Sequence, residues 1–390
     1  MLNQRHAQGT GGFVVPWLPR GHLEPTVAMS SSAFRIAQRA QTVRVGDDAL
    51  SHLADELDAV GGQRAFVVST RGRSAFADEV VAALGDRVVG AFDEARQHVP
   101  RATVDAARAA FDRAGADCVI AVGGGSAIGL GKALALESAS PLPLVALPTT
   151  YAGSEATNIW GLRDGDHKTT GRDDRVAPRT ILYLPRWTVG LPAALTAASG
   201  LNAMAHSVEA LYAPDVNPMT RLLAIDSIRS LAGALRRLVV TATDLDARAD
   251  AQWGAYLAGT ALDRASLGLH HKLCHVLGGS FGLPHAETHA VLLPWAVAYN
   301  APAAPDAMVA IADAIGAPSA PPGLHDLASE LGIPPSLSAI GFDPADVDRA
   351  VEIALQRQYP NPRPIEAAPL AAMLRDAANG VAPGSYPSAD

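Results

Sequence analysis

Short apolar runs alternate with stretches of helical spacing over the first half of the chain. The runs have the length and composition of buried strands. They are RAFVVST (64–70), CVIAVG (118–123), LVALPT (144–149) and TILYLP (180–185). Between them, segments 74–85 and 104–115 repeat apolar residues with a helical period. Because strands that alternate with helices are typical of a parallel sheet with helices on both faces, we predict a Rossmann-like α/β domain over residues 31–188.

The pattern changes after residue 189, where the strand-like runs end. Three Ala/Leu-rich segments with a helical period follow: 193–213, 217–239 and 246–262. Further helical patches continue toward the end of the chain, so we predict an all-helical second domain over residues 189–383. Within it, the proline-rich stretch 301–323 predicts a long loop between helices.

The two ends of the chain show no periodic pattern. Glycine, proline, glutamine and arginine are scattered through residues 1–30. We interpret this segment as a flexible leader, or as a stretch upstream of a true start at Met29. Residues 384–390 predict a frayed tail.

Composition and charge exclude several classes of function. The net charge of -8 and the lack of a Lys/Arg-rich run argue against a nucleic-acid partner. The most apolar longer stretch, 118–136, is interrupted by glycines and by Lys132, so it predicts strand, turn and helix rather than a membrane span. Cys118 and Cys274 are the only cysteines, which is no disulfide framework and fits a cytoplasmic protein.

The segment GGGS (123–126) joins a predicted strand to a predicted helix. Because Gly123, Gly124 and Gly125 lack a Cβ atom, the backbone can approach a phosphate closely, and the helix behind Ser126 offers free N–H groups to a pyrophosphate. The spacing departs from the common dinucleotide fingerprint. A plain tight turn between strand and helix is therefore the alternative interpretation.

A second loop of small residues, PTTYAGSEAT (148–157), follows another predicted strand. The hydroxyls of Thr149, Thr150 and Ser154 can donate hydrogen bonds to a dinucleotide. This loop therefore strengthens the hypothesis of a nicotinamide cofactor.

The end of a third strand, VVSTRGR (67–73), bears on the form of the cofactor. Such a strand end often carries an acid that binds the ribose 2′-hydroxyl, but here it has Ser69, Arg71 and Arg73. An arginine would accept a 2′-phosphate, so we expect Ser69 and Arg71 near the cofactor and NADPH to be at least tolerated. The alternative is that both arginines are solvated surface charges.

Histidines are concentrated between residues 270 and 289. They are His270, His271, His275, His285 and His289. His271 and His275 stand four residues apart, as do Asn202 and His206 in an earlier predicted helix, so each pair shares a helix face. A lone helical histidine is usually a satisfied polar side chain, whereas histidines that converge from separate segments predict a functional cluster.

The order of these features resembles the iron-containing (group III) alcohol dehydrogenase superfamily over residues 35 to 380. The resemblance implies its two-part architecture, which dehydroquinate synthase shares. In metal-dependent members, an aspartate and three histidines hold iron or zinc. The matching positions here are Asn202, His206, His271 and His285. Because an amide is a poor, neutral ligand, we expect no catalytic metal.

Within the superfamily, the wording resembles most closely that of the maleylacetate reductases. The matching motifs are PTTYAGSE (148–155), HHKLCHVLGG (270–279), LPHAETHAVLLP (283–294) and NPRP (361–364). The resemblance implies an NADH- or NADPH-dependent homodimer that reduces the C=C bond of maleylacetate to give 3-oxoadipate, late in the degradation of aromatic rings.

Reduction of such a substrate suits imidazoles. Hydride can add at the alkene carbon remote from the ketone, and the charge then spreads into an enolate that an imidazolium or an ammonium can stabilise and protonate. We predict that His271 and His285 act as enolate stabiliser and proton donor, that His206 shapes the pocket, and that His275 lies against the nicotinamide.

A small dicarboxylate substrate also requires cations. Lys272 lies inside the histidine segment, and Arg163, Lys168 and Arg172 lie in GLRDGDHKTTGRDD (161–174), which we predict to be a loop. Each of these four can equally be a solvated surface charge.

Two acidic residues and four alternative functions also follow from the sequence. We expect Glu155 and Glu209 to be structural and to pair with neighbouring helix ends. The alternatives are a metal-dependent alcohol or aldehyde reductase of the same fold, a zinc-dependent dehydroquinate-synthase-like lyase, a catalytically silent binding protein, and a reductase of a related enoate in another pathway. Asn202 argues against the first, and the absence of a matching glutamate and phosphate contacts argues against the second.

Overall fold

The computed structural model describes residues 34, 36, 38–72, 74–165, 167–357 and 359–387, without the side chains of Ser74 and Lys168. The predicted leader with Met29, and residues 388–390 of the predicted tail, lie outside these residues. Both predicted domains belong to one compact unit, Ile36–Asp390. The boundary that we place near residue 188 stays a prediction.

The apolar runs of the first half form a parallel sheet, as predicted. In the described residues it has six strands in the order β1-β8-β5-β4-β2-β3. Their bounds are β1 (Thr42–Val45), β2 (Ala65–Val68), β3 (Val88–Phe92), β4 (Cys118–Gly123), β5 (Leu144–Pro148) and β8 (Thr180–Tyr183). The sequence pattern missed β1 and β3, which are only partly buried because each lies at an edge of the sheet.

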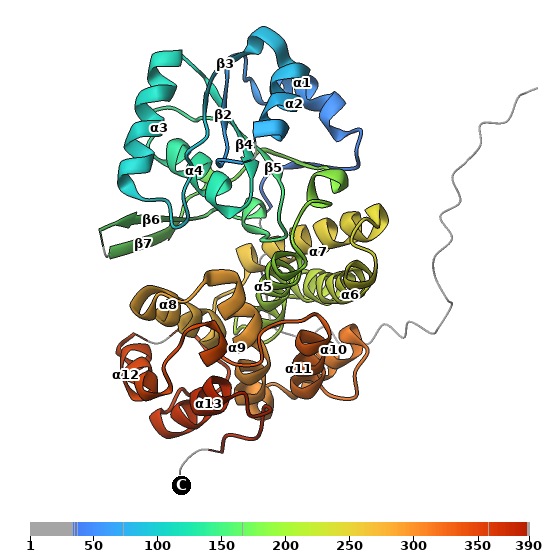
Figure 1. Cartoon of the computed structure of the whole chain (residues 1–390), viewed down its shortest axis with the longest axis vertical. Helices are drawn as coiled ribbons and strands as arrows, with labels where there is room; N and C mark the ends of the chain where they lie inside the picture. Colours follow the sequence, from blue (N-terminus) through green and yellow to red (C-terminus); the bar gives the residue numbers. More distant parts are fainter. Residues whose placement is uncertain are drawn as a thin grey trace, which may run out of the picture. The chain divides into compact units, whose positions relative to one another are not determined.

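Side chains of the strands alternate between two apolar layers, so helices cover both faces. The helices are α1 (Leu53–Val60), α2 (Ser74–Leu84), α3 (Arg101–Ala114) and α4 (Gly125–Leu136). α3 and α4 lie on one side of the sheet, and α1 and α2 lie on the other (Figure 1). On β4, Val119 and Ala121 pack in the layer of α3 and α4, whereas Cys118 and Ile120 pack in the layer of α1 and α2. The two-residue period of a strand produces this division.

The centre of the sheet contains a topological switch point, where successive strands stop adding on one side of β2 and continue on the other. β4 pairs with β2 on one side and with β5 on the other, and α2 and α4 cover opposite faces. Open α/β sheets bind ligands at such a point, beyond the carboxyl ends of the strands. The glycine loop follows β4 and the threonine loop follows β5, so both predicted cofactor loops lie at that edge.

Residues 161–174, predicted as a loop, are mostly an antiparallel hairpin, so that prediction was wrong. β6 (Ile159–Asp164) pairs with β7 (His167–Arg172) from Ile159–Arg172 to Asp164–His167. β7 (HKTTGR) is polar and β6 (IWGLRD) lacks a regular apolar alternation, which hid both strands in the sequence. Trp160 packs across the hairpin on Gly171, where a Cβ atom would lie 2.7 Å from Trp160 Cζ2.

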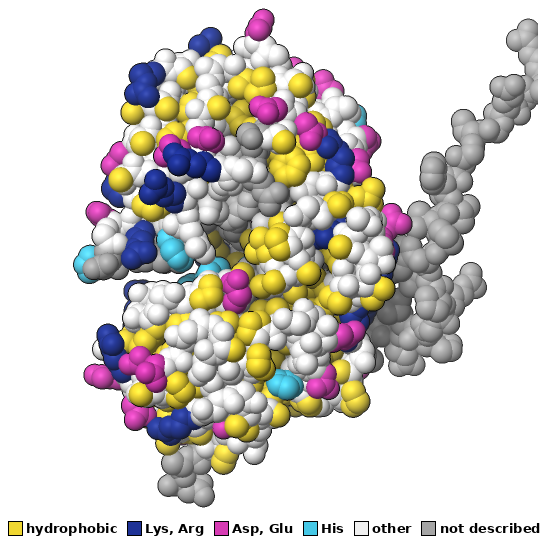
Figure 2. Space-filling view, viewed as in Figure 1, with side chains coloured by type: hydrophobic (Ala, Val, Ile, Leu, Met, Phe, Trp, Pro, Cys, Tyr) yellow, Lys and Arg dark blue, Asp and Glu magenta, His cyan; other side chains and the backbone are white. Residues whose placement is uncertain are grey.

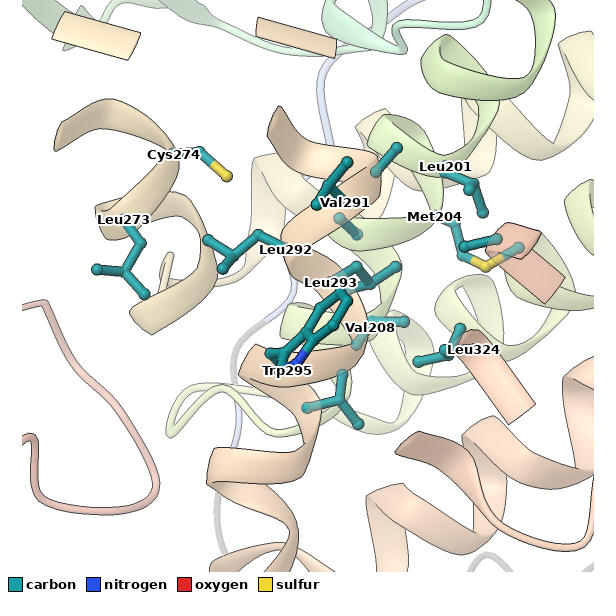
Figure 3. Packing of buried hydrophobic residues seen from close by; sticks show 14 of the residues in the cluster. Leu201, Met204, Val208, Leu273, Cys274, Val291, Leu292, Leu293, Trp295 and Leu324 are labelled. Atoms are coloured by element: carbon teal, nitrogen blue, oxygen red, sulfur yellow. The ribbon is translucent and has the colours of Figure 1, made fainter. Parts of the chain in front are cut away.

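The second half of the described chain contains helices and no strand, as predicted. The helices are α5 (Ala193–Leu211), α6 (Pro218–Val240), α7 (Leu245–Arg264), α8 (Leu269–Phe281), α9 (His285–Asn300), α10 (Pro305–Ile315), α11 (Ala320–Glu330), α12 (Val347–Gln356) and α13 (Ala367–Asn379). Leu201, Met204 and Val208 of α5 face Val291 and Leu293 of α9 in the core (Figure 3). Among the described helices, none combines the length and apolar composition needed to cross a membrane.

The predicted long loop at 301–323 was also wrong, because it contains α10 and the start of α11. Pro305 begins α10, and Pro321 and Pro322 lie in the first turn of α11. The first turn of a helix has no internal acceptor for its N–H groups, so proline is tolerated there. A high proline content therefore marked helix starts rather than a loop.

Candidate active site

One cavity of about 550 Å³ connects the edge of the sheet to the helical half. Its lining includes nine of the residues that the sequence singled out: Gly125, Ser126, Thr150, Ser154, Asn202, His206, His271, His275 and His285. Histidine side chains are visible in the recess on this side of the molecule (Figure 2). The cofactor loops and the histidine cluster therefore open into the same space.

The glycine loop contacts the threonine loop directly. Gly123 has a φ of 144°, which is unfavourable for other residues, and its carbonyl accepts a hydrogen bond from the Thr149 N–H at 3.1 Å. A Cβ atom on Gly124 would lie 2.9 Å from Thr150 Cγ2. Gly124 precedes α4, whose first residues, Gly125 and Ser126, face the cavity. The alternative of a plain tight turn does not account for that exposure.

This edge of the sheet fits a dinucleotide. No side chain caps the N-terminus of α4, and a Cβ atom at Gly125 would meet nothing within 4 Å. The Thr149 hydroxyl is fully buried and has no hydrogen-bond partner among the described residues. Free N–H groups and the dipole at the start of a helix are what a pyrophosphate requires.

Lys132, which the sequence did not single out as a site residue, fixes the threonine loop. Its ammonium is buried and donates to the carbonyls of Ser154 (2.6 Å), Thr157 (2.9 Å) and Ile159 (2.8 Å). Burial lowers the pKa of Lys132 to about 7, against the opposing effect of nearby Glu155. The residue also lines the cavity, so one side chain links α4 to the second cofactor loop. A lysine inside an apolar helical run was the available signal.

Ser69 and Arg71 lie elsewhere than expected. Neither lines the cavity, and Ser69 is buried with its N–H bonded to the Phe92 carbonyl. Arg71 forms an ion pair with Glu94, which reaches the end of β2 through a bridge to Thr70. An acid therefore does stand at this strand end, supplied by the neighbouring strand, and it weakens the argument for a 2′-phosphate. Arg73 lies outside the described residues.

The histidines converge from three helices. α5 contributes Asn202 and His206, α8 contributes His271 and His275, and α9 begins at His285. The ring centroids of His206 and His271 are 5.0 Å apart and stacked. His289, one turn after His285, lies 4.9 Å from His271 and 4.4 Å from His285, measured between ring centroids. The predicted cluster thus exists, and His289 extends it.

Glu209 orients His271. Its Oε2 atom accepts from His271 Nδ1 at 2.6 Å and from the Gly268 N–H at 3.0 Å, and its Oε1 atom accepts from the His270 N–H at 2.7 Å. Glu209 is therefore bound to the first turn of α8, as predicted for a structural acid. In addition it fixes the His271 ring, whose Nε2 atom has no partner in the described chain. The sequence did not reveal this second role.

Burial disfavours the charged form of three histidines in this region. It lowers the pKa of His206 and His289 well below the usual value, and neighbouring histidines add to the effect. It also lowers the pKa of His270 to about 4. Burial alone would raise the pKa of Glu209, but His271 and the N–H groups lower it below its usual range. The site therefore combines one buried carboxylate with three histidines that burial keeps neutral, His206, His270 and His289.

The four positions that correspond to the family's metal ligands fit a divalent transition metal poorly. Asn202 Oδ1 and His206 Nδ1 are buried without partners, but both groups are neutral. In the described chain, the triads with donor atoms within 4.8 Å of one another are His270–Cys274–His289 and Glu209–His270–His271. Neither triad contains His206 or His285, and their one carboxylate, Glu209, already accepts hydrogen bonds from three N–H groups. Without a free anionic ligand, much of the attraction for a dication is missing.

The four cations predicted to bind the substrate differ in how close they lie to the cavity. Lys272 is buried beside the cavity rather than in its lining, with Nζ 5.5 Å from the centre of the Tyr359 ring. Arg172 donates to the carbonyls of Leu262 and Asp263 at the end of α7. Arg163 donates to the Gly165 carbonyl in the hairpin turn, and the side chain of Lys168 is not described. Arg172 is thus committed to the fold, whereas the Lys272 ammonium lies over the ring of Tyr359, which does line the cavity.

Comparisons with known proteins match both halves of the chain. The model of the iron-containing alcohol dehydrogenases matches residues 40–185, and that of the C-terminal part of the Fe-containing alcohol dehydrogenase family matches residues 196–378. The chain is 50% identical to a maleylacetate reductase of Burkholderia cepacia over 352 residues, which is 90% of this chain and 99% of that protein. It is 48% identical to a maleylacetate reductase of Pseudomonas sp. (strain P51), over 87% of this chain and 96% of that one.

A solved structure shows the same fold. The crystal structure of maleylacetate reductase from Rhizobium sp. strain MTP-10005 superposes with a TM-score of 0.86 at 42% identity. The match covers 90% of this chain and 99% of the other. The likeness therefore extends over both the sheet and the helical half.

Proposed function

The chain belongs to the iron-containing alcohol dehydrogenase family and, within it, to the maleylacetate reductases, and on this premise we propose that it reduces the conjugated C=C bond of maleylacetate to give 3-oxoadipate, with NADH or NADPH as cofactor. The observation that carries the proposal is the cavity that leads from the glycine loop to a cluster of imidazoles, two of which, His206 and His289, are kept neutral by burial.

The two ends of the cavity have separate tasks. Gly125, Ser126 and Thr150 would hold the dinucleotide, with the Thr149 hydroxyl behind them. When bound, the reduced nicotinamide supplies a hydride. Lys132 keeps the threonine loop in place through its three carbonyl contacts. The substrate then lies between this edge and the histidines.

His271 is the group we assign to the ketone oxygen. As hydride adds to the alkene carbon remote from the ketone, the alkene electron pair moves toward the carbonyl, and the oxygen gains negative charge. Because Glu209 accepts the Nδ1 proton of His271, the Nε2 atom can donate to that oxygen when the ring carries its second proton as an imidazolium, which the buried Glu209 carboxylate stabilises. Preorganised donors of this kind lower the barrier without reorganisation during the reaction.

His285 is the group we assign to proton delivery. The enolate collapses to the ketone when a proton adds to the alkene carbon next to it, and His285 lines the cavity at the first residue of α9. The stacked ring of His206 shapes the wall, while His275 is placed by its 3.1 Å contact with the Tyr359 hydroxyl. We keep His275 as the candidate neighbour of the nicotinamide.

We further propose that the reaction proceeds without a catalytic metal. Charge that is delocalised over an enolate requires less Lewis-acid assistance than an isolated alkoxide. The support from this chain is the neutral donor set described above, in which Asn202 replaces the family's aspartate. A metal-dependent alcohol or aldehyde reductase is the competing function, since the family model covers such enzymes.

The test is product analysis. Purified protein is mixed with maleylacetate and either NADH or NADPH, loss of nicotinamide absorbance is followed, and the product is identified by mass spectrometry. We expect 3-oxoadipate from maleylacetate and no turnover of simple aldehydes. Turnover of aldehydes with intact maleylacetate would support the competing function, and turnover of another enoate alone would move the enzyme to a different pathway.

Two further expectations accompany the function. We propose a cytoplasmic location, supported by two buried cysteines that form no disulfide with each other. We also propose a homodimer, supported by the family resemblance. Analytical ultracentrifugation tests the second expectation, and a single species of monomer mass would contradict it.

A further inference from the structure

A second, more open cavity of about 520 Å³ adjoins the first, and Leu267 and Tyr359 line both. Its charged residues are Arg172, Arg264, Arg357, Asp215 and Asp263. The substrate cavity therefore continues past Tyr359 into a space with more cationic than anionic side chains.

Most of these charges are already bound to other groups. Arg172 donates to carbonyls at the end of α7, and Arg264 donates to the Thr260 carbonyl. Asp215 accepts from the Ser266 N–H and hydroxyl, and Asp263 pairs with Arg39. Arg357 makes no hydrogen bond or ion pair within the described chain, which leaves it available for a ligand.

Lys272 is the second available cation, and it is 9% exposed. Its Nζ atom lies 5.5 Å from the centre of the Tyr359 ring, and in the described residues it has no hydrogen bond or ion pair. Burial lowers the pKa of Lys272, and nearby Arg357 lowers it further. An ammonium in such a place is uncommon without an anion, because burial of an unpaired charge is costly.

The loop that carries Tyr359 is held firmly in place. The Tyr359 hydroxyl lies 3.1 Å from His275 Nδ1. Two residues later, Asn361 accepts from the Leu269 N–H at 3.3 Å and donates to Asn300 Oδ1 at 2.7 Å. Tyr359 is thus tied both to α8 and to the end of α9, so its ring is a fixed wall between the histidines and Arg357.

We propose that Lys272 and Arg357 bind the carboxylate of the substrate's acetate arm where the two cavities meet at Tyr359. This inference rests on the proposed function and deepens it. The acetate arm is attached to the ketone carbon, on the side away from the alkene. Lys272 reaches this place because its Nζ atom lies over the ring of Tyr359, the residue that lines both cavities. The other carboxylate, on the alkene, stays nearer the cofactor.

The test compares two substrates in matched variants. Maleylacetate carries the acetate arm, and cis-4-oxopent-2-enoate keeps the enone and its carboxylate but ends in a methyl group. Lys272→Met and Arg357→Met remove the cations and keep apolar stems. Arg349→Met is the control, because the Arg349 guanidinium lies 5.3 Å from the centre of the Phe281 ring, which lines neither cavity, whereas Lys272 lies over Tyr359, which lines both.

We expect Lys272→Met to lower kcat/KM for maleylacetate by about tenfold to hundredfold, the effect of one charge-assisted hydrogen bond, and for the methyl ketone by less than about twofold. Arg357→Met follows the same pattern with a smaller effect, since the residue is exposed. Equal losses on both substrates, or a loss confined to the methyl ketone, would overturn the assignment.

A binding measurement separates this subsite from the reaction. Adipate has the same chain length and two carboxylates but nothing to reduce, and its Kd is measured by calorimetry. We expect about tenfold weaker binding for Lys272→Met and an unchanged Kd for Arg349→Met. Wild-type protein that binds adipate through Lys272 yet leaves maleylacetate intact would refute the proposed function and keep the subsite. Adipate binding that Lys272→Met leaves unchanged would refute the subsite alone.

Discussion

Replacement of Glu209 by glutamine should damage both the fold and the reaction. The carboxylate accepts three hydrogen bonds, from His271 Nδ1 at 2.6 Å, from the His270 N–H at 2.7 Å and from the Gly268 N–H at 3.0 Å. Glutamine offers one oxygen and one NH₂ group. In either orientation, the NH₂ group faces a backbone N–H that had an acceptor, so one buried donor is left unpaired.

The magnitude follows from these contacts. A hydrogen bond to a charged group contributes roughly 1.5–3 kcal/mol, and an unpaired buried donor costs a further 1–3 kcal/mol or so. We therefore expect Glu209→Gln to lower the free energy of unfolding by about 3 kcal/mol. The His271 ring also loses its fixed orientation, and kcat on maleylacetate should fall about a hundredfold, while the Kd of NADH changes by less than about twofold.

Urea unfolding and steady-state kinetics measure the two effects, with Ser207→Ala as the control. Ser207 lies two residues earlier on α5, is also buried, and donates only to the Ser227 hydroxyl at 2.8 Å. Its loss should cost about 1 kcal/mol and leave kcat unchanged. If Glu209→Gln keeps wild-type kcat, or if Ser207→Ala reduces kcat equally, the orienting role of Glu209 is refuted.

Three other outcomes follow from the structure. Gly124→Ala places a Cβ atom 2.9 Å from Thr150 Cγ2, so the KM for NADH should rise at least about tenfold, with stability nearly intact. The Kd of NADH is measured by fluorescence titration, and an unchanged Kd would contradict this expectation. Lys132→Met leaves three carbonyls without their donor and should lower the melting temperature and weaken cofactor binding together, whereas an unchanged melting temperature would refute the clamp. His270 has a pKa of about 4 in the folded chain against an ordinary histidine value of 6.5, so the unfolded chain binds the extra proton; stability should fall by about 3 kcal/mol between pH 6.5 and 4, and urea midpoints that stay level over that range would contradict it.

Periodicity revealed the parts of the fold in which burial is one-sided or complete. β2, β4, β5 and β8 are fully buried, so their apolar runs stand out in the sequence. β1 and β7 have no such run, and β3 and β6, which do contain apolar residues, are only partly buried. Proline at the starts of α10 and α11 imitated a loop, because the same residue is compatible with both.

The candidate site was likewise predictable only in part. Residues that repeat at helical spacing, such as Asn202 with His206 and His271 with His275, could be placed on shared faces before their helices were seen. Glu94 reaches Arg71 across two strands, and Tyr359 reaches His275 from a loop 84 residues away. Spacing along the chain carries no signal for such contacts, since tertiary packing alone creates them.

The central claim is that imidazoles, without a metal, stabilise the enolate in this cavity. The most direct measurement is the rate of maleylacetate reduction by wild type and by Asn202→Asp, before and after exhaustive treatment with a chelator, together with the metal content of each protein. The account predicts that wild-type kcat survives chelation with substoichiometric iron and zinc, and that the added carboxylate raises metal affinity without raising kcat. Activity that disappears with the chelator and returns only with iron or zinc would contradict it.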